Sequence, residues 1–204
     1  MGQPKQLLPF GTNHLLDLAL AAVAFTEIER TLVVLGAHEQ KITDKLWLDE
    51  YEVISNENWQ KGMITSVKAG LNALGDWPDW VIIHPCDYAL VERATVGSLL
   101  VRALSLGDAT PMVRPCFYGK SGHPIMLGRS TLDAVRSLDD GVGLDSIVQA
   151  YKPEGELVEV SDPTIHFDID TPDDYQRALN AWQARRETHE RVTQALTEEH
   201  KTCD

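Results

Sequence analysis

An apolar run that ends at a carboxylate, residues 79–87, constrains the fold more than any other stretch of this chain. Three consecutive β-branched residues follow Trp80, and Pro78 and Pro85 bound the run. The absence of polar alternation predicts a strand buried on both faces, which in α/β proteins is a central parallel strand. Because ligands bind beyond the carboxyl ends of such strands, Asp87 is a candidate to hold a metal ion or a hydroxyl group. Its alternative role is to cap a helix or turn.

Composition narrows the class of protein further. A chain of 204 residues is long enough for one α/β domain with a well-buried core. No apolar run approaches the roughly 20 residues of a membrane span, and a formal net charge of −13 argues against nucleic acid as a partner. Three widely spaced cysteines form neither a disulfide framework nor a zinc motif, and no signal peptide is evident. We therefore expect a cytoplasmic protein that binds neither nucleic acid nor membrane.

Hydrophobic periodicity predicts strands and helices in alternation. Helices are expected over residues 13–25, 38–48, 63–75, 95–106, 130–138 and 144–151, and from Thr171 onward. Strands are expected over residues 31–35, 52–54, 79–83, 112–113, 125–127, 157–160 and 167–170. Alternation of this kind predicts a single α/β domain with a mainly parallel sheet and helices on both faces. We place that domain at residues 1–184 and a charged helical tail at residues 185–204.

Six short motifs, each weak alone, occur in an order that is specific. They are residues 1–9 (Met-Gly-Gln-Pro-Lys-Gln-Leu-Leu-Pro), residues 58–63 with Ser66, Cys86-Asp87, Gly122-His123-Pro124, Gly141-Val142-Gly143, and residues 168–175. Together they resemble the MobA-like nucleotidyltransferases, and within them the molybdenum-cofactor cytidylyltransferases (MocA-like), over nearly the whole chain. This resemblance implies a Rossmann-like, three-layer fold of the nucleotide-diphospho-sugar-transferase type.

The resemblance also implies a reaction. A phosphate of an acceptor would attack the α-phosphate of a nucleoside triphosphate, with CTP favoured, and pyrophosphate would leave. The acceptor would be a phosphorylated small molecule such as the molybdopterin cofactor, and Mg²⁺ would be required. A molybdoenzyme or its maturation chaperone would be the partner protein. Positioning and charge neutralisation supply most of the rate in such transfers.

The family match assigns the charged groups of such a site. Asp87, Asp168 and Asp170 would hold Mg²⁺, which prefers a few oxygen ligands plus substrate phosphates. Lys5 would be catalytic together with Asp87, as a point charge on the phosphates. Helix capping for the three carboxylates and simple surface exposure for the lysine are the alternatives.

Five further residues are assigned to nucleotide or substrate binding: Gly2, Pro4, Asn58, Ser66 and His123. The side chains of Asn58 and Ser66 would read the base or ribose at a helix start that offers free N–H groups. His123 would contact the acceptor from a turn constrained by glycine and proline. Ordinary loop structure, and a histidine bonded to the backbone, are the competing interpretations.

The sequence departs from the family at its opening. Residues 1–8 match only the last half of the family's first motif, whose preceding strand and glycine-rich loop would lie upstream. We expect such a segment to precede Met1, since a sheet without it exposes two unpaired inner edges. Without that segment, the chain could instead be a weakly active relic that binds a cofactor or a partner protein. A third reading takes Asp168 and Asp170 as the paired carboxylates of a metal-dependent glycosyltransferase.

Overall fold

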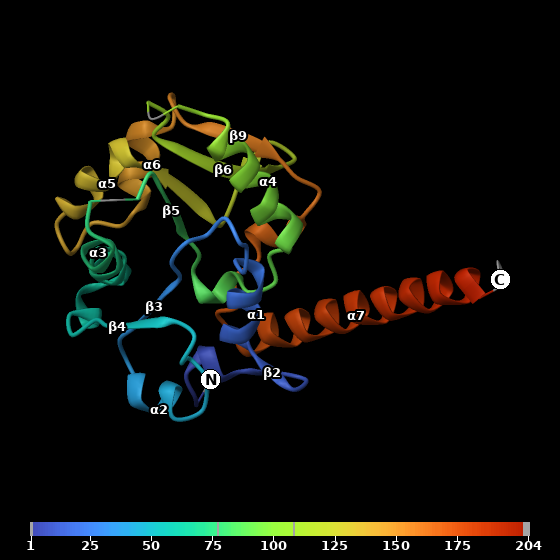
Figure 1. Cartoon of the computed structure of the whole chain (residues 1–204). Helices are drawn as coiled ribbons and strands as arrows, with labels where there is room; N and C mark the ends of the chain where they lie inside the picture. Colours follow the sequence, from blue (N-terminus) through green and yellow to red (C-terminus); the bar gives the residue numbers. More distant parts are fainter. Residues whose placement is uncertain (1, 77, 108, 202–204) are drawn as a thin grey trace.

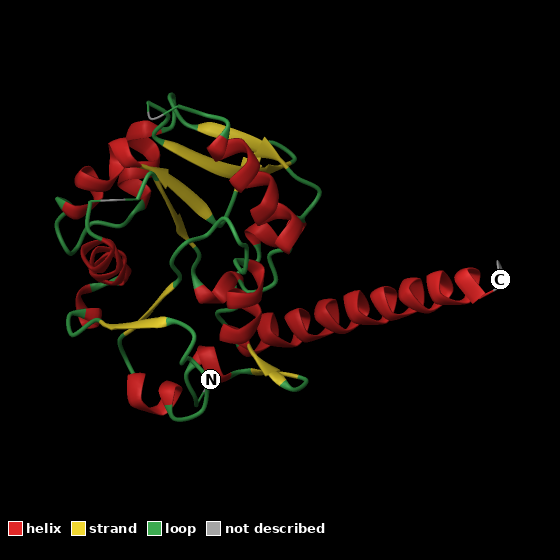
Figure 2. Ribbon diagram, in the orientation of Figure 1, coloured by secondary structure: helices red, strands yellow, loops and turns green. Residues whose placement is uncertain are grey.

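The computed structural model describes residues 2–76, 78–107 and 109–201, with side chains through residue 194. Its strands form one large sheet and two small ones (Figure 2). The small sheets are an antiparallel hairpin of β1 (Pro9–Phe10) and β2 (Asn13–His14), and a parallel pair of β3 (Leu32–Leu35) and β4 (Glu52–Ser55). The large sheet contains β5 (Trp80–Ile83), β6 (Met112–Phe117), β7 (Lys120–Ser121), β8 (Ile125–Gly128) and β9 (Glu156–Glu159).

The large sheet has the strand order β5-β8-β6-β7, and β9 pairs with β6. Strand β8 runs antiparallel to both β5 and β6, whereas β9 runs parallel to β6. The expected α/β class is confirmed. The sheet is mixed because β8 runs antiparallel to both of its neighbours while β9 runs parallel to β6.

Helices cover both faces of the large sheet (Figure 1). The α-helices are α1 (Leu15–Ala22), α2 (Glu39–Thr43), α3 (Met63–Leu74), α4 (Arg93–Leu104), α5 (Arg129–Arg136), α6 (Asp145–Tyr151) and α7 (Pro172–Lys201). Short 3₁₀ helices are η1 (Lys5–Leu7), η2 (Trp59–Lys61), η3 (Cys86–Tyr88) and η4 (Pro163–His166). Helices α3, α5 and α6 pack on one face, and α4 packs on the other.

Adjacent residues on the central strands supply two separate cores. On β8, Leu127 packs with α3, α5 and α6, while its neighbour Met126 packs with α4. On β6, Met112 and Val113 divide in the same way. Successive side chains of a strand point to opposite faces, so a strand covered on both sides needs apolar residues at every position. This requirement explains the uninterrupted apolar runs of the sequence.

Two expected elements differ in the structure. Residues 167–170 form no strand, and Ile169 instead lies fully buried with its N–H donating to the carbonyl oxygen of Asp87 at 3.1 Å. Helix α1 was expected to follow a turn capped by Asn13, but the β1–β2 hairpin precedes it and His14 is the N-cap. The His14 N–H donates to Asp17 Oδ2 at 2.7 Å, completing a capping box that the sequence pattern did not indicate.

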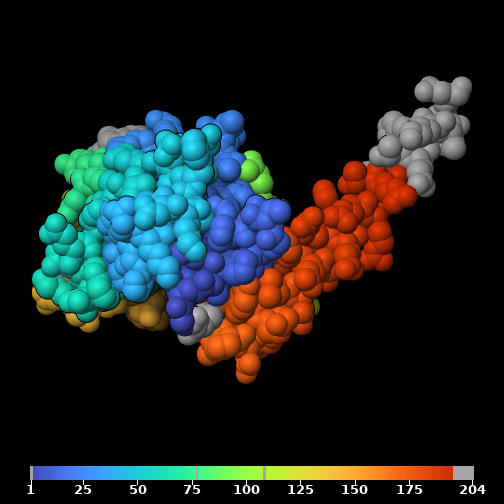
Figure 3. Space-filling model, turned by 90° about the horizontal axis from the view of Figure 1, so that it is seen from below, coloured from blue at the N-terminus to red at the C-terminus, as the bar shows by residue number. Residues whose placement is uncertain are grey.

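Helix α7 begins as the sequence predicts. The N–H of Asp174 donates to Thr171 Oγ1 at 3.2 Å, and the Thr171 N–H donates to Asp174 Oδ2 at 2.8 Å. Ala178 and Trp182 pack against the body, after which the helix extends away from it (Figures 1 and 3). Within the described part of the chain, neither α7 nor any other helix is both long and apolar enough to cross a bilayer.

The sheets contain the expected break. In the described ranges, β3 pairs only with β4, and β5 pairs only with β8. Within these ranges, the other edge of each strand has no strand beside it. A cavity of about 560 Å³ separates the free edges of β3 and β5.

Candidate active site

Asp87 lies in η3, just beyond the carboxyl end of β5, where the apolar run of the sequence placed it. Its Oδ1 atom is buried and has no hydrogen-bond partner among the described residues. Burial raises the pKa of this carboxyl, Lys5 opposes the shift, and Asp170 and Asp168 add to it. A carboxylate oxygen without a donor, beside other negative groups, favours binding of a cation.

Lys5 and Asp170 form an ion pair across the same edge of the sheet. The two residues are far apart in sequence, and on the Asp170 side the hydrogen bond from the Ile169 N–H to the Asp87 carbonyl joins this segment to η3. Because Ile169 is fully buried, Asp168 and Asp170 on either side of it are carried to the neighbourhood of Asp87. One lysine and three carboxylates therefore share this edge.

The donor set fits a magnesium ion. In the described ranges, no group of three or more His, Cys, Asp and Glu side chains is arranged to hold a metal ion by itself. Mg²⁺ does not need such a group, since one or two carboxylates plus substrate phosphates commonly bind it. Asp87 has an oxygen without a hydrogen-bond partner among the described residues. Asp170 already binds one positive group, the ammonium group of Lys5. The metal roles of Asp87, Asp168 and Asp170 stay predictions.

The polar loop after β4 is organised by Asn56, which the sequence did not single out. Asn56 is 5% exposed, and its side-chain nitrogen donates to Thr65 Oγ1 at 2.8 Å and to Ser66 Oγ at 2.9 Å. Its oxygen accepts from the Asn58 N–H at 2.9 Å. The two predicted residues lie in different environments: Ser66 lines the cavity, whereas Asn58 is exposed at the N-cap of η2. Its position directly after a strand was the available signal for Asn56.

His123 lies in the constrained turn that the motif Gly122-His123-Pro124 predicts. A Cβ on Gly122 would lie 2.3 Å from the Ile165 carbonyl oxygen, so glycine is required there. The His123 ring lies 4.3 Å from the ring of Tyr88, the residue after Asp87, and the His123–Pro124 peptide bond is cis. Its Nδ1 atom is buried and has no hydrogen-bond partner among the described residues, and burial lowers the pKa of the imidazole. The ring is therefore neutral at pH 7.

Arg114 is a second group that the sequence did not single out. It lies on β6, is 7% exposed, and donates from Nη1 to Ser121 Oγ at 2.8 Å. Its Nε atom is buried without a partner, and burial lowers the pKa of the guanidinium. Its charge also contributes to the lowered pKa of His123. Residues 112–113 were expected to be part of a strand, and an arginine directly after them carries no local signal of function.

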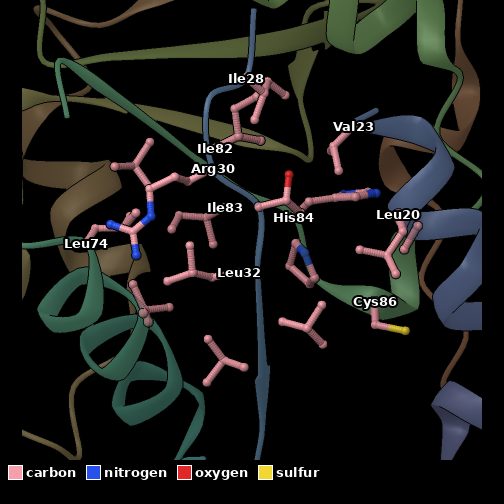
Figure 4. Close-up of a pocket in the computed structure, with 18 of the residues that line it drawn as sticks. Leu20, Val23, Ile28, Arg30, Leu32, Leu74, Ile82, Ile83, His84 and Cys86 are labelled. Carbon is pink, nitrogen blue, oxygen red and sulfur yellow. The ribbon is translucent and has the colours of Figure 1, made fainter. Parts of the chain in front are cut away.

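The opening residues act mainly through the backbone. Pro4 is buried, and its carbonyl accepts from the Leu7 N–H at 3.0 Å, which closes η1 and sets the position of Lys5. Gly2 is exposed, with φ of +66° and open space around it. The structure therefore brings Lys5, Ser66 and Asp87 to one cavity and leaves Gly2 and Asn58 on the surface. Figure 4 shows part of this cavity, with Cys86 at the end near Asp87.

The α/β fold thus places a lysine and several carboxylates at one sheet edge, an arrangement compatible with the binding of phosphates and a metal ion. Residues 1–155 match the MobA-like NTP transferase domain, and the chain belongs to this family.

Two characterised relatives differ in their named activities. The chain is 27% identical to nicotine blue oxidoreductase of Paenarthrobacter nicotinovorans, over 86% of this chain and 88% of that protein. It is 24% identical to molybdenum cofactor cytidylyltransferase of Escherichia coli, over 86% of both chains.

Solved structures share the fold. Rv0371c of Mycobacterium tuberculosis superposes with a TM-score of 0.76 at 24% identity, over 88% of this chain and 90% of that one. Its complex with manganese gives a TM-score of 0.74, over 88% of this chain and 93% of that one. A nucleotidyl transferase from Methanothermobacter gives 0.73 at 21% identity, over 89% and 86% of the two chains.

Proposed function

We propose that this protein transfers CMP from CTP to a phosphorylated small molecule of the molybdopterin type. The observation that carries the proposal is the Lys5–Asp170 ion pair beside the unpartnered Oδ1 of Asp87. Family membership supports nucleotidyl transfer, and the name of the Escherichia coli relative supports the choice of nucleotide and acceptor. A reducing cytoplasm, and a molybdoenzyme or its chaperone as the receiving protein, complete the proposal.

The reaction exchanges one phosphoanhydride bond for another. An oxygen of the acceptor phosphate attacks the α-phosphorus of CTP and forms a new P–O bond. The bond from the α-phosphorus to the oxygen that bridges it to the β-phosphorus breaks, and pyrophosphate leaves with that electron pair. Negative charge builds up on the leaving group, so groups that neutralise it provide most of the catalysis.

Lys5 is placed to provide one such charge. Its ammonium group is partly exposed and paired with Asp170, which is itself half exposed, so incoming phosphates can compete for it. A lysine acts here as a mobile point charge on a flexible stem. Asp87 and Asp170 would hold Mg²⁺, which supplies charge neutralisation at the phosphates when bound.

His123 and Arg114 are assigned to the acceptor side of the site. Both carry a buried nitrogen without a partner, and both are close enough to influence each other's charge. A neutral imidazole and a guanidinium offer donors suited to the phosphate or the polar rings of an acceptor.

A comparison of four triphosphates tests the proposal. CTP, GTP, ATP and UTP are each incubated with Mg²⁺ and a molybdopterin-type acceptor, and pyrophosphate release is measured. We expect release with CTP that depends on the acceptor. Equal release without acceptor, or release with GTP only, would contradict the assigned substrates.

The same assay distinguishes the alternatives. Hydrolysis of a sugar nucleotide without use of any triphosphate would support a glycosyltransferase. Tight, Mg²⁺-dependent nucleotide binding without turnover would support a relic that acts as a binding module. One relative is named an oxidoreductase, an activity that no contact between described residues favours over transfer.

A further inference from the structure

Strand β9 lies at the outer edge of the large sheet (Figure 1). It runs parallel to β6, and in the part of the chain that the structure describes no strand lies along its other side. The Val160 N–H donates to the Cys116 carbonyl at 2.9 Å, so this N–H faces β6. Backbone groups alternate sides along a strand, so those of Leu157 and Glu159 point away from β6. Both residues therefore direct an N–H and a C=O outward.

The two glutamates of β9 are held within this chain. Edge strands commonly avoid association by carrying charged side chains. Here Glu156 accepts from Nε and Nη2 of Arg102 at 3.2 and 2.6 Å, and Glu159 accepts from the Tyr118 N–H at 3.2 Å. Neither carboxylate therefore extends freely across the edge. The side chain between them, Leu157, is apolar and 48% exposed.

A large aromatic side chain lies at the carboxyl end of the same edge. Tyr118 is 86% exposed and occupies the two-residue turn between β6 and β7, with φ of +48°. This backbone conformation is unfavourable for a bulky residue, and asparagine or glycine is the usual choice in such a turn. The bond to Glu159 places Tyr118 beside the last residue of β9. Leu157 and Tyr118 are thus two large apolar groups exposed along one edge.

We propose that the outer edge of β9 pairs with the same edge of a second copy of this chain, so that the two large sheets become one. A two-fold axis that relates identical edges makes the paired strands antiparallel. With Val158 opposite its own copy, Leu157 lies opposite Glu159 of the second copy. All outward N–H and C=O groups of these two residues then form hydrogen bonds across the axis.

Hydrogen bonding and charge select this register over its neighbours. A shift that places Leu157 opposite itself would need the N–H of Gly155, which already donates to the Tyr151 carbonyl at 3.0 Å. A shift that places Glu159 opposite itself would set two carboxylates side by side, which is destabilising. The register centred on Val158 avoids both conflicts.

The side chains of the chosen register are also complementary. On the face that α4 covers, Val158 meets its own copy, and Glu156 lies opposite Val160 of the second copy. On the other face, Tyr118 stands beside Glu159 and therefore close to Leu157 of the second copy. The pairing thus covers both exposed apolar groups and sets no glutamate opposite another.

The contact is short, so the dimer is weak. A strand of four residues with one aromatic side chain falls in the size range of transient complexes, below about 1,200 Å². The net charge of −13 also repels a second copy. We therefore expect a dissociation constant between about 10 μM and 1 mM.

Sedimentation equilibrium of the full chain and three variants tests the proposal across this concentration range. Salt at about 0.15 M screens charges that lie more than about 8 Å apart. Leu157→Glu sets a like charge opposite Glu159 of the second copy, and Leu157→Lys sets an opposite charge there. Val192→Lys, which removes a 53% exposed side chain from α7, is the matched control. Thermal unfolding checks that every variant is folded.

We expect Leu157→Glu to weaken association by about tenfold or more, because like charges directly opposite are destabilising. Leu157→Lys and Val192→Lys should associate within about threefold of the unchanged chain. Amide hydrogen exchange at Leu157 and Glu159 should slow by about threefold or more at the highest concentration. Exchange at Val160, whose N–H already bonds to Cys116, should stay constant.

A monomer at every concentration would overturn the proposal, and so would undiminished association of Leu157→Glu. Equal loss of association in Leu157→Lys and Leu157→Glu would contradict the register. Dimers in which exchange at Leu157 is not slowed would place the contact on another surface. These measurements involve neither nucleotide nor acceptor, so their outcome is independent of the proposed nucleotidyl transfer.

Discussion

At the scale of single residues, the proposed catalytic role of Asp87 is the one that the structure supports best. Replacement by asparagine keeps the shape of the side chain and removes its charge. We expect Asp87→Asn to lower turnover by about a hundredfold or more, with Tm unchanged or raised, because a buried carboxylate without a partner is lost. Pyrophosphate release and thermal unfolding measure the two effects. The exposed Asp49→Asn change is the matched control, and equal turnover of both variants at saturating Mg²⁺ would refute the assignment.

Lys5 makes a second prediction at this scale. Its ion pair with Asp170 joins two partly exposed side chains, and such pairs contribute about 0 to 1 kcal/mol to stability. We therefore expect Lys5→Ala to weaken CTP binding by about tenfold while Tm stays nearly constant. Calorimetric titration measures the affinity, with the exposed Lys41→Ala as control. An unchanged dissociation constant would remove Lys5 from the site.

His84 predicts how stability depends on pH. Burial, with a smaller contribution from His123, lowers its pKa from 6.5 to about 4. The unfolded chain therefore binds a proton more readily, and the folded state loses stability as pH falls from about 6.5 toward 4. The full effect is about 3 kcal/mol.

Urea unfolding at pH 7 and pH 4.5 checks this dependence. The His84→Gln variant should show a smaller loss between the two pH values than the unchanged protein. His189→Gln, on the exposed part of α7, should behave like the unchanged protein. Equal losses in all three proteins would show that His84 does not titrate in this way.

At the scale of elements, the sequence predicted those that depend on local pattern. The apolar run at β5, the helix start at Thr171 and the glycine turn at His123 could all be predicted, because each is fixed by neighbouring residues. The strand expected at residues 167–170 was not found. Ile169 is buried there by a contact with the backbone of Asp87, and such a distant contact leaves no periodic signal. Asn56 and Arg114 were missed because their partners depend on tertiary packing.

The buried side chain of Asp162 connects two elements by hydrogen bonds. It is 2% exposed, and its carboxylate accepts from the Glu92 N–H at 2.7 Å, Thr95 Oγ1 at 3.0 Å and the Thr164 N–H at 2.9 Å. These bonds join the start of α4 to η4. We expect Asp162→Ala to lower the free energy of unfolding by about 3 kcal/mol, since several buried donors lose their acceptor.

Chemical denaturation measures this loss, and the exposed Asp49→Ala change is the control. A loss below about 1 kcal/mol would mean that water replaces the carboxylate at little cost.

At the scale of the whole molecule, the predicted domain limit at residue 184 lies within helix α7, and one residue beyond it contacts the folded body. Arg185 donates from Nη1 to the Leu90 carbonyl at 2.6 Å and lies 3.5 Å from Asp162. Arg186 stacks over Trp182 at 4.9 Å. Residues 187–194 are exposed. Arg185 therefore joins the start of the predicted tail to the folded body.

Truncation tests this limit. A chain that ends at residue 187 should unfold with the same free energy as the full chain, within about 1 kcal/mol. A chain that ends at residue 184 should lose about 1 to 3 kcal/mol, because the Leu90 carbonyl and Asp162 lose a charged donor. Identical stability of the two truncated chains would place the limit at residue 184 after all.

The most direct test of nucleotidyl transfer follows the α-phosphate of CTP. The protein is incubated with Mg²⁺, a molybdopterin-type acceptor and CTP that carries a radioactive α-phosphate. The account predicts that the label moves to the acceptor in equal amount to the unlabelled pyrophosphate released, and that Asp87→Asn abolishes both. Label that remains in CTP, or that appears only as free CMP, would contradict it.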